Sequence, residues 1–213
     1  MSALTEVLFI ERCLRLLKPG GRMGIVLPEG VLNNSNLQKV REYFEGQAKI
    51  ILICSIPQDV FIKAGATVKP SLVFFKKFTE AERKQYDEIV KKVRKLVNDK
   101  YVDEIQELQA KYELKQITKA KLNVELKIIE AKKIEEAKPL IKEWFNYEIP
   151  IAKVDKAGIT TTGTPCDNEL TEVLQEYRKY NELNPLWDIH TRSWEYVLDE
   201  NLIIKKINTI STN

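Results

Sequence analysis

Apolar positions in the first 78 residues alternate between helical and strand-like spacing. Val7, Leu14 and Leu17 recur at helical intervals, and the Lys-Pro-Gly-Gly run that follows predicts the end of that helix. We interpret three later apolar runs, residues 23–27, 50–56 and 71–75, as strands. The amphipathic segment at residues 37–44, between the first two of these runs, is interpreted as a helix. The first run contains almost no polar residue, which favours a parallel strand covered on both faces. The alternation predicts an α/β unit.

Residues 79–138 contain neither glycine nor proline, and their apolar positions form a narrow stripe. Thr79 and Glu82 have the spacing of a capping box, so we expect a helix to begin there. Apolar residues recur at intervals of three or four across residues 86–134, as in a coiled coil. Since a single helix of this length would extend about 90 Å, we predict an antiparallel hairpin that reverses between residues 113 and 123.

Residues 139–213 form the third segment that the sequence indicates. A strand is predicted at residues 147–154, at a sheet edge because Pro150 cannot donate to a ladder. A polar, threonine-rich turn follows at residues 158–163. A further helix is expected from about Asn168, and no element is assigned after Trp187.

Composition excludes several classes of protein. The 34 Lys and Arg against 31 Asp and Glu leave a net charge of +3, too small to indicate a nucleic-acid partner by itself. The separated Cys13, Cys54 and Cys166 form neither a disulfide framework nor a zinc motif, which favours a reducing cytoplasm. The one histidine, His190, excludes a multi-histidine metal site. No apolar run approaches the roughly 20 residues that span a bilayer, so we expect no membrane partner.

Four short motifs mark the turns and strands of the first segment. They are LLKPGG at 16–21, LPEGVLNN at 27–34, SIPQDVF at 55–61 and GATVKPSLVFFKK at 65–77. A helix that ends in LLKPGG and leads into a strand resembles the later half of the methyltransferase fold that uses S-adenosylmethionine. The order of the other motifs is similar to that in the N6-adenine DNA methyltransferases, above all the modification subunit of type I restriction-modification systems and related fused enzymes. The resemblance covers about residues 5–78 and 147–177.

The resemblance implies an α/β fold: the C-terminal half of a Rossmann-like methyltransferase sheet, with the helical hairpin or coiled coil inserted into it. Two motifs that the family requires are missing from the sequence, a glycine-rich cofactor turn and an Asn/Asp-Pro-Pro-aromatic motif. The run Asn184-Pro185-Leu186-Trp187 is the only similar one, and Leu186 replaces the second proline. We therefore expect S-adenosylmethionine to act in the complete enzyme, where a missing N-terminal half would help to bind it. We expect this chain alone to be inactive.

The resemblance also implies roles for residues in the loops. Enzymes that modify a base within a duplex flip it out and stack it on an aromatic side chain. Phe61 occupies the matching position, although it could equally cap the core beneath its loop. Lys63 and Lys69 would neutralise DNA phosphates, unless they are merely solvated. Five residues are expected to shape the pocket: Pro28, Glu29, Gly30, Gly65 and Thr67. Among them, Glu29 is expected to be structural and not catalytic. No residue is assigned a catalytic role, and no metal site is expected.

Together these features predict part of a DNA adenine-N6 methyltransferase of a restriction-modification system, which contributes base stacking and DNA positioning. The expected partners are DNA, the N-terminal half of the methyltransferase and a specificity subunit that docks on the helical segment, with the restriction subunit as a further candidate. The alternative is a non-catalytic interaction module that presents a coiled-coil arm. A methyltransferase relative acting on RNA or protein is a third interpretation.

Overall fold

A computed structural model of the chain describes residues 5–185, 194–198 and 204–208. The chain forms two compact units, residues 1–170 and 171–213. Leu186, Trp187 and His190, which figured in the sequence arguments, lie outside the described residues.

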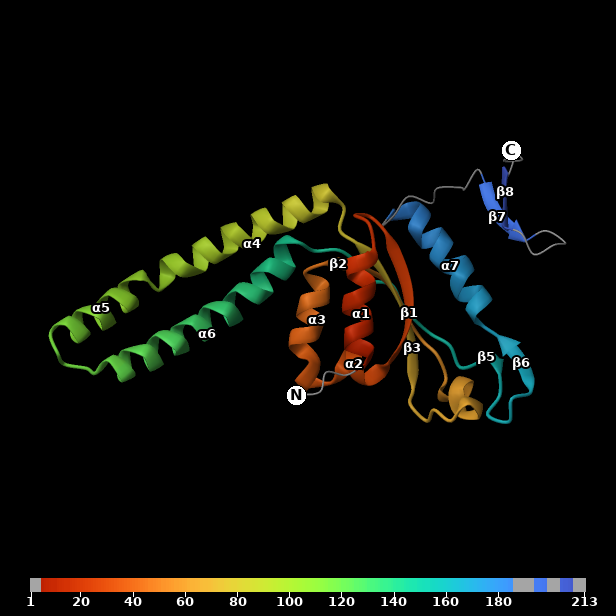
Figure 1. Cartoon of the computed structure of the whole chain (residues 1–213), viewed down its shortest axis with the longest axis horizontal. Helices are drawn as coiled ribbons and strands as arrows, with labels where there is room; N and C mark the ends of the chain where they lie inside the picture. Colours follow the sequence, from red (N-terminus) through yellow and green to blue (C-terminus); the bar gives the residue numbers. More distant parts are fainter. Residues whose placement is uncertain (1–4, 186–193, 199–203, 209–213) are drawn as a thin grey trace. The chain divides into compact units, whose positions relative to one another are not determined.

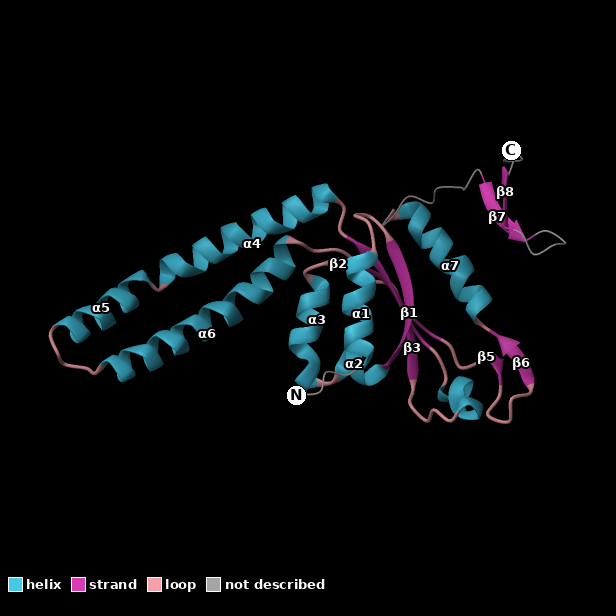
Figure 2. Ribbon diagram, viewed as in Figure 1, coloured by secondary structure: helices cyan, strands magenta, loops and turns pink. Residues whose placement is uncertain are grey.

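A four-stranded mixed sheet forms the centre of the first unit (Figure 2). Its order is β1 (Arg22–Pro28), β3 (Pro70–Lys77), β2 (Ala48–Ser55) and β4 (Ile151–Lys153). Strand β3 is antiparallel to both of its neighbours, whereas β4 is parallel to β2. The three strands expected in the first segment are confirmed, and the strand expected at residues 147–154 is confirmed as the short edge strand β4.

The prediction that β1 is a parallel strand covered on both faces is wrong. Among the described residues β1 pairs with β3 alone, and that pairing is antiparallel. Burial alternates along the strand, so that Leu27 is 1% exposed whereas Val26 is 45% exposed. The unbroken apolar run shows that both faces of β1 carry apolar side chains. The described part of the chain covers only one of these two faces.

Helices cover one face of this sheet (Figure 1). They are α1 (Thr5–Leu16), α2 (Glu29–Asn33) and α3 (Gln38–Glu45), with the short 3-10 helix η1 (Ser35–Leu37) between the last two. Each buried apolar side chain in this layer contributes about 1.5–3 kcal/mol. The side chains of this core come from helices and strands alike: Ile10, Leu14, Leu27, Val31, Phe44, Ala48, Val73 and Phe75.

The helical segment forms an antiparallel hairpin, as predicted (Figure 1). It consists of α4 (Glu80–Lys100), α5 (Val102–Glu113) and α6 (Lys119–Trp144), and we call residues 80–144 the arm. The capping box at the start of α4 is present. The chain reverses where Lys115 takes a left-handed conformation, with φ 57°, and where Thr118 caps α6. Sequence spacing gave no sign of this turn because a lysine occupies the position that glycine usually takes.

The arm continues beyond the boundary that the sequence indicated at residue 138. Helix α6 passes through Pro139 and ends at Trp144. A proline inside a helix removes one backbone hydrogen bond, but the neighbouring Ala137, Leu140 and Ile141 pack against the buried valines of α4. This packing holds the last turns of α6 in place.

Aromatic rings close the base of the arm. Phe78, just before α4, and Phe145, just after α6, have ring centroids 5.3 Å apart. Tyr86 lies 5.2 Å from Phe145, and Tyr147 lies 6.3 Å from it. The arm therefore leaves and re-enters the sheet at nearly the same place.

The remaining strands form two small hairpins. In the first unit, β5 (Ala157–Ile159) pairs antiparallel with β6 (Pro165–Asn168). The second unit contains most of α7 (Leu170–Leu183), which confirms the last predicted helix, and the antiparallel pair β7 (Trp194–Leu198) and β8 (Ile204–Asn208). Within the described ranges, no helix is long and apolar enough to cross a membrane.

Candidate nucleic-acid interface

One edge of the sheet brings together the loops that carry the residues chosen from the sequence. Strand β1 ends and β3 begins where Pro28 lies opposite Pro70. Strand β2 ends where Ser55 lies opposite Ser71. The segments that leave β1 and β2 and enter β3 are therefore adjacent, and we call residues 28–30 and 55–70 the loop edge. Ligands of open α/β sheets bind at the carboxyl ends of strands, which is where the loop edge lies.

Glu29 connects three segments of the loop edge. Ser55 Oγ donates to Glu29 Oε1 at 2.7 Å, and Lys69 Nζ forms an ion pair with the same oxygen at 3.1 Å. The bond from Ser55, followed by burial acting in the opposite sense and by the Lys69 ammonium, leaves the pKa of Glu29 below its ordinary value. The carboxylate is thus held as an anion that fastens the loops, and Lys69 shares its positive charge with it.

Phe61 and Lys63 lie in a short 3-10 helix, η2 (Gln58–Ala64), that follows β2. Phe61 is half-buried and Lys63 is exposed. Ala66 N–H donates to the carbonyl oxygen of Phe61 at 3.0 Å, which folds the chain back over the end of η2. Both interpretations of Phe61 remain compatible with a ring that is partly covered and partly accessible.

The expected pocket-shaping residues act mainly through the backbone. Gly65 has φ +82°, a left-handed conformation that glycine adopts without strain, and it ends η2. The Gln58 side-chain amide donates to the carbonyl oxygen of Thr67. At Gly30 an added Cβ would meet nothing within 4 Å, so sterics do not require a glycine there. Pro28 is the last residue of β1.

A hairpin from the third segment lies against η2, which the sequence did not predict. A Cβ on Gly163 would clash with the aliphatic part and the Nζ of Lys63, so the lysine side chain lies directly on this glycine. Gly163 has φ +77° and belongs to the turn between β5 and β6. The threonine-rich turn was visible in the sequence, but its position beside Lys63 depends on tertiary structure.

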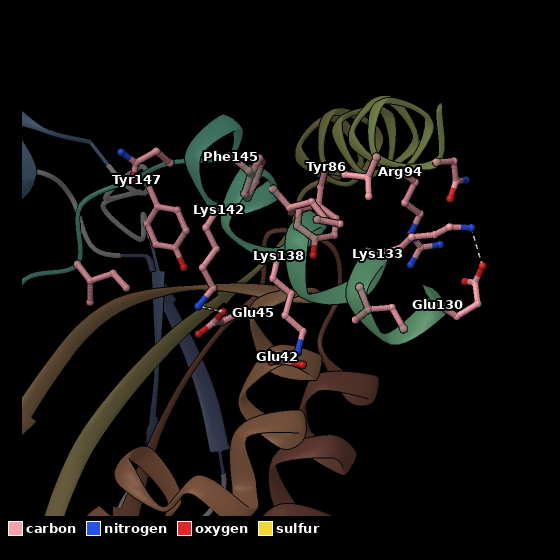
Figure 3. A pocket seen from close by; sticks show the side chains of 17 residues that line it. Glu42, Glu45, Tyr86, Arg94, Glu130, Lys133, Lys138, Lys142, Phe145 and Tyr147 are labelled. Atoms are coloured by element: carbon pink, nitrogen blue, oxygen red, sulfur yellow. Dashed lines mark hydrogen bonds and ion pairs between the residues drawn. The ribbon is translucent and has the colours of Figure 1, made fainter. Parts of the chain in front are cut away.

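A groove lies at the base of the arm, away from the loop edge (Figure 3). It is a half-open groove of about 730 Å³ between α3, α4, α6 and the segment after α6. Glu42 of α3 pairs with Lys138 of α6 at 3.0 Å, and Glu45 pairs with Lys142 at 2.9 Å. Figure 3 shows the Glu45 and Lys142 side chains pointing toward one another. The matching i, i+3 and i, i+4 spacings were a sequence signal that these two helices meet.

Within the described residues, the Gly20-Gly21 turn does not lie where an S-adenosylmethionine site needs a glycine turn. Gly20 N–H donates to the carbonyl oxygen of Lys77, so the Gly20-Gly21 turn lies at the amino end of β1. A cofactor of this kind needs a glycine turn at the carboxyl end of a strand. Within the described residues, no group of His, Cys, Asp and Glu that could hold a metal ion occurs.

Comparison with known proteins identifies the family. The N-6 DNA methylase family model matches residues 2–143, which is two thirds of the chain. The chain therefore belongs to the N-6 DNA methylase family. None of the curated proteins matches it.

Two solved structures are similar over part of the chain. A Listeria monocytogenes protein, provisionally described as a class I S-adenosylmethionine-dependent methyltransferase, is 28% identical over 35% of this chain and 22% of its own, with a TM-score of 0.32. A chain from a type I restriction-modification system is 32% identical over 36% of this chain and 16% of its own, with a TM-score of 0.33. The chain thus spans less than a quarter of the length of either protein.

Proposed function

We propose that this chain is part of a DNA adenine-N6 methyltransferase of a restriction-modification system, and that the loop edge forms one wall of its DNA cleft. Family membership supports a role in DNA methylation. The observation that carries the proposal is the meeting of η2, the Glu29 cluster and the β5–β6 turn on one side of the sheet. The complete enzyme would transfer the methyl group of S-adenosylmethionine to the adenine amine.

Within this cleft Phe61 would stack on the flipped adenine. Stacking a base on an aromatic ring is worth about 1–3 kcal/mol. The ring is half-buried, so the loop holds it while one part stays accessible. Lys63 and Lys69 would contact phosphates on either side of the target, which positions the duplex without reading its sequence.

The N-terminal half of the methyltransferase would supply the cofactor-binding turn and the catalytic motif, and it would dock on β1. Among the described residues that strand pairs on one side only. In the described part of the chain no strand pairs with the other side of residues 23–27, and such an edge is a template for a further strand. Exposed apolar side chains lie on β1 and on α1 beside it: Leu8, Phe9, Leu16 and Val26. The arm would dock the specificity subunit, with the restriction subunit as a further partner.

The test is the Phe61→Ala substitution in the complete enzyme. We expect the affinity for a duplex that contains the target adenine, or the rate of its methylation, to fall about fivefold to a hundredfold because one base–aromatic contact is lost. The rate is measured as transfer of a labelled methyl group to the duplex.

Tyr43→Ala is the matched control, because Tyr43 is an exposed aromatic residue on α3, 43% accessible and outside both the arm and the loop edge. It should leave methylation within about twofold of the unaltered enzyme. If Phe61→Ala methylates as fast as this control, Phe61 has no part in the site. Tight binding of S-adenosylmethionine by the present chain alone would contradict the proposed dependence on another half.

A second candidate function is a non-catalytic interaction module. Two apolar side chains of α6 that lie one turn apart, Val124 and Ile128, are 55% and 45% exposed, and no described residue covers them fully. A partner helix could bind such a stripe. This function predicts a defined protein complex and no duplex binding even at low salt, whereas the leading proposal requires duplex binding.

A further inference from the structure

The turn between β5 and β6 and the side chain of Lys63 lie together beside η2. We propose that Lys63 and the hydroxyl groups of Thr160, Thr162 and Thr164 form a binding site for one phosphate of the nucleic-acid backbone, with Gly163 as the residue that positions the lysine. The inference rests on the proposed function and extends the DNA surface to a segment that carries no assigned role.

Three hydroxyl groups converge on the turn. Thr160 Oγ1 lies 2.6 Å from Thr164 Oγ1 and 3.0 Å from Thr162 Oγ1. These two short contacts use two of the three hydroxyl protons, because each hydroxyl group has one proton to donate. The third contact, between Thr162 and Thr164, is long at 3.4 Å. The proton of this long contact is the one most readily given to an outside acceptor, and Thr162 and Thr164, which share it, are exposed.

The ammonium group of Lys63 reaches this turn because Gly163 has no side chain. Its Nζ and the two carbons before it occupy the space where a Cβ of residue 163 would lie. The chain neighbours of Gly163 are Thr162 and Thr164, so the cation and the hydroxyl groups share one small surface. Hydroxyl and ammonium donors together suit an acceptor-only, negatively charged group.

The charges around the turn favour an anion. Residues 157–166 contain no acidic residue. The two acidic groups that follow are engaged elsewhere in the hairpin: Asp167 pairs with Lys156 at 2.6 Å, and Glu169 accepts from Asp155 N–H at 2.8 Å. A phosphate at the turn would meet no uncompensated carboxylate from β6.

The position of the turn identifies the anion as a backbone phosphate. Lys63 follows Phe61 by two residues in the same short helix, η2. A phosphate held by Lys63 would therefore lie close to a base stacked on Phe61. Contacts of this kind fix the register of a protein on a duplex but carry no sequence information.

The test measures binding of a fluorescent duplex of arbitrary sequence to the complete 213-residue chain, at several salt concentrations. Lys63→Ala should weaken binding about threefold to tenfold and reduce the slope of log K against log salt by about 0.9, because one phosphate contact is lost. Thr162→Val combined with Thr164→Val should weaken binding without changing that slope. Lys39→Ala, which removes the same charge from an exposed position on α3, should change neither quantity beyond about twofold.

Gly163→Ala supplies the second, independent readout. It should weaken binding in the unaltered chain by displacing Lys63, yet have little effect when Lys63 is already alanine, because the two changes act on one contact. Thermal unfolding checks that each variant is folded.

Each outcome decides between the proposals. If Lys63→Ala behaves like Lys39→Ala while the chain still binds duplex, the phosphate site is refuted and the proposed function stands. If the unaltered chain binds no duplex at low salt, the proposed function itself is contradicted. If the losses of duplex affinity from Gly163→Ala and Lys63→Ala simply add in the double variant, Gly163 does not position Lys63.

Discussion

Glu82, near the start of the arm, forms ion pairs with two lysines of the sheet. Its Oε1 pairs with Lys49 at 2.9 Å and with Lys76 at 3.3 Å, and its Oε2 accepts from Thr79 N–H at 2.8 Å. Burial alone would raise the pKa of Glu82, but the Thr79 bond and the two lysines lower it to about 2. Glu82 therefore joins β2, β3 and the start of the arm only while it is ionised.

This arrangement predicts a pH-dependent stability. A carboxyl group with a lowered pKa stabilises the fold above its unfolded pKa of about 4.5, and that contribution is lost as the pH falls toward 2. Glu82→Gln should lower the free energy of unfolding at pH 7 by about 1.5–3 kcal/mol. The difference should shrink between pH 4.5 and pH 2. Urea unfolding at pH 7 and near pH 3 measures both values.

The control for this prediction is Glu143→Gln, an exposed position on α6. It should change stability by less than about 0.5 kcal/mol at either pH. A deficit of Glu82→Gln that stays the same across the acid range would show that the lowered pKa does not stabilise the fold.

At the residue scale, the sequence revealed what depends on near neighbours. The capping box of Thr79 and Glu82 follows from a spacing of three residues, and the structure confirms it. The contact between Lys63 and Gly163 joins residues from distant segments, so no local pattern announced it. For the same reason the sequence placed Lys69 among the DNA-binding candidates without showing that Glu29 shares its charge.

At the scale of elements, the arm is attached to the sheet by a base that has its own buried apolar contacts. The rings of Phe78 and Phe145 meet there, and Val93 and Val97 of α4 are buried beside Ala137 of α6. Farther along, α5 contributes no buried residue, and Ile129 of α6 is the one buried apolar side chain of residues 102–135. The outer part of the arm should therefore contribute little to the stability of the sheet.

Shortening the arm tests this expectation. Tyr101 Oη donates to Glu136 Oε1 at 2.5 Å, so the chain can be joined there by replacing residues 102–135 with a linker of about four residues. We expect cooperative unfolding with a midpoint within about 5 °C of the original, followed by circular dichroism. Loss of the cooperative transition would show that the outer arm is required for folding.

The spacing of apolar residues predicted which helices and strands form more successfully than the direction in which strands pair or the residue at which a helix ends. The helical hairpin and the three strands follow from apolar spacing, which the chain itself carries. The direction of β1 does not, because parallel and antiparallel neighbours accept the same apolar residues. The end of α6 was also missed, since Pro139 suggests a boundary that packing against α4 overrides.

At the scale of the whole molecule, the side of β1 away from β3, with which no described strand pairs, is the feature that most needs a partner. Edge strands with free backbone groups invite pairing, and folded proteins usually cover or charge them. Val26 on this strand is 45% exposed, and Phe9 on α1 is 61% exposed. Both observations agree with the proposal that the N-terminal half of the methyltransferase docks here, and with the match of the chain to the N-6 DNA methylase family.

Hydrogen exchange of the backbone amides tests this docking. In the isolated chain, the amides of residues 23–27 that point away from β3 should exchange quickly, because no described strand pairs with them. Addition of the N-terminal half as a separate polypeptide should slow their exchange by at least about tenfold. Residues 70–77 of β3, which pair on both sides, should exchange slowly in both states and serve as the internal control. A complex that forms without protecting residues 23–27 would place the interface elsewhere, and β1 would then be an edge that this protein leaves open.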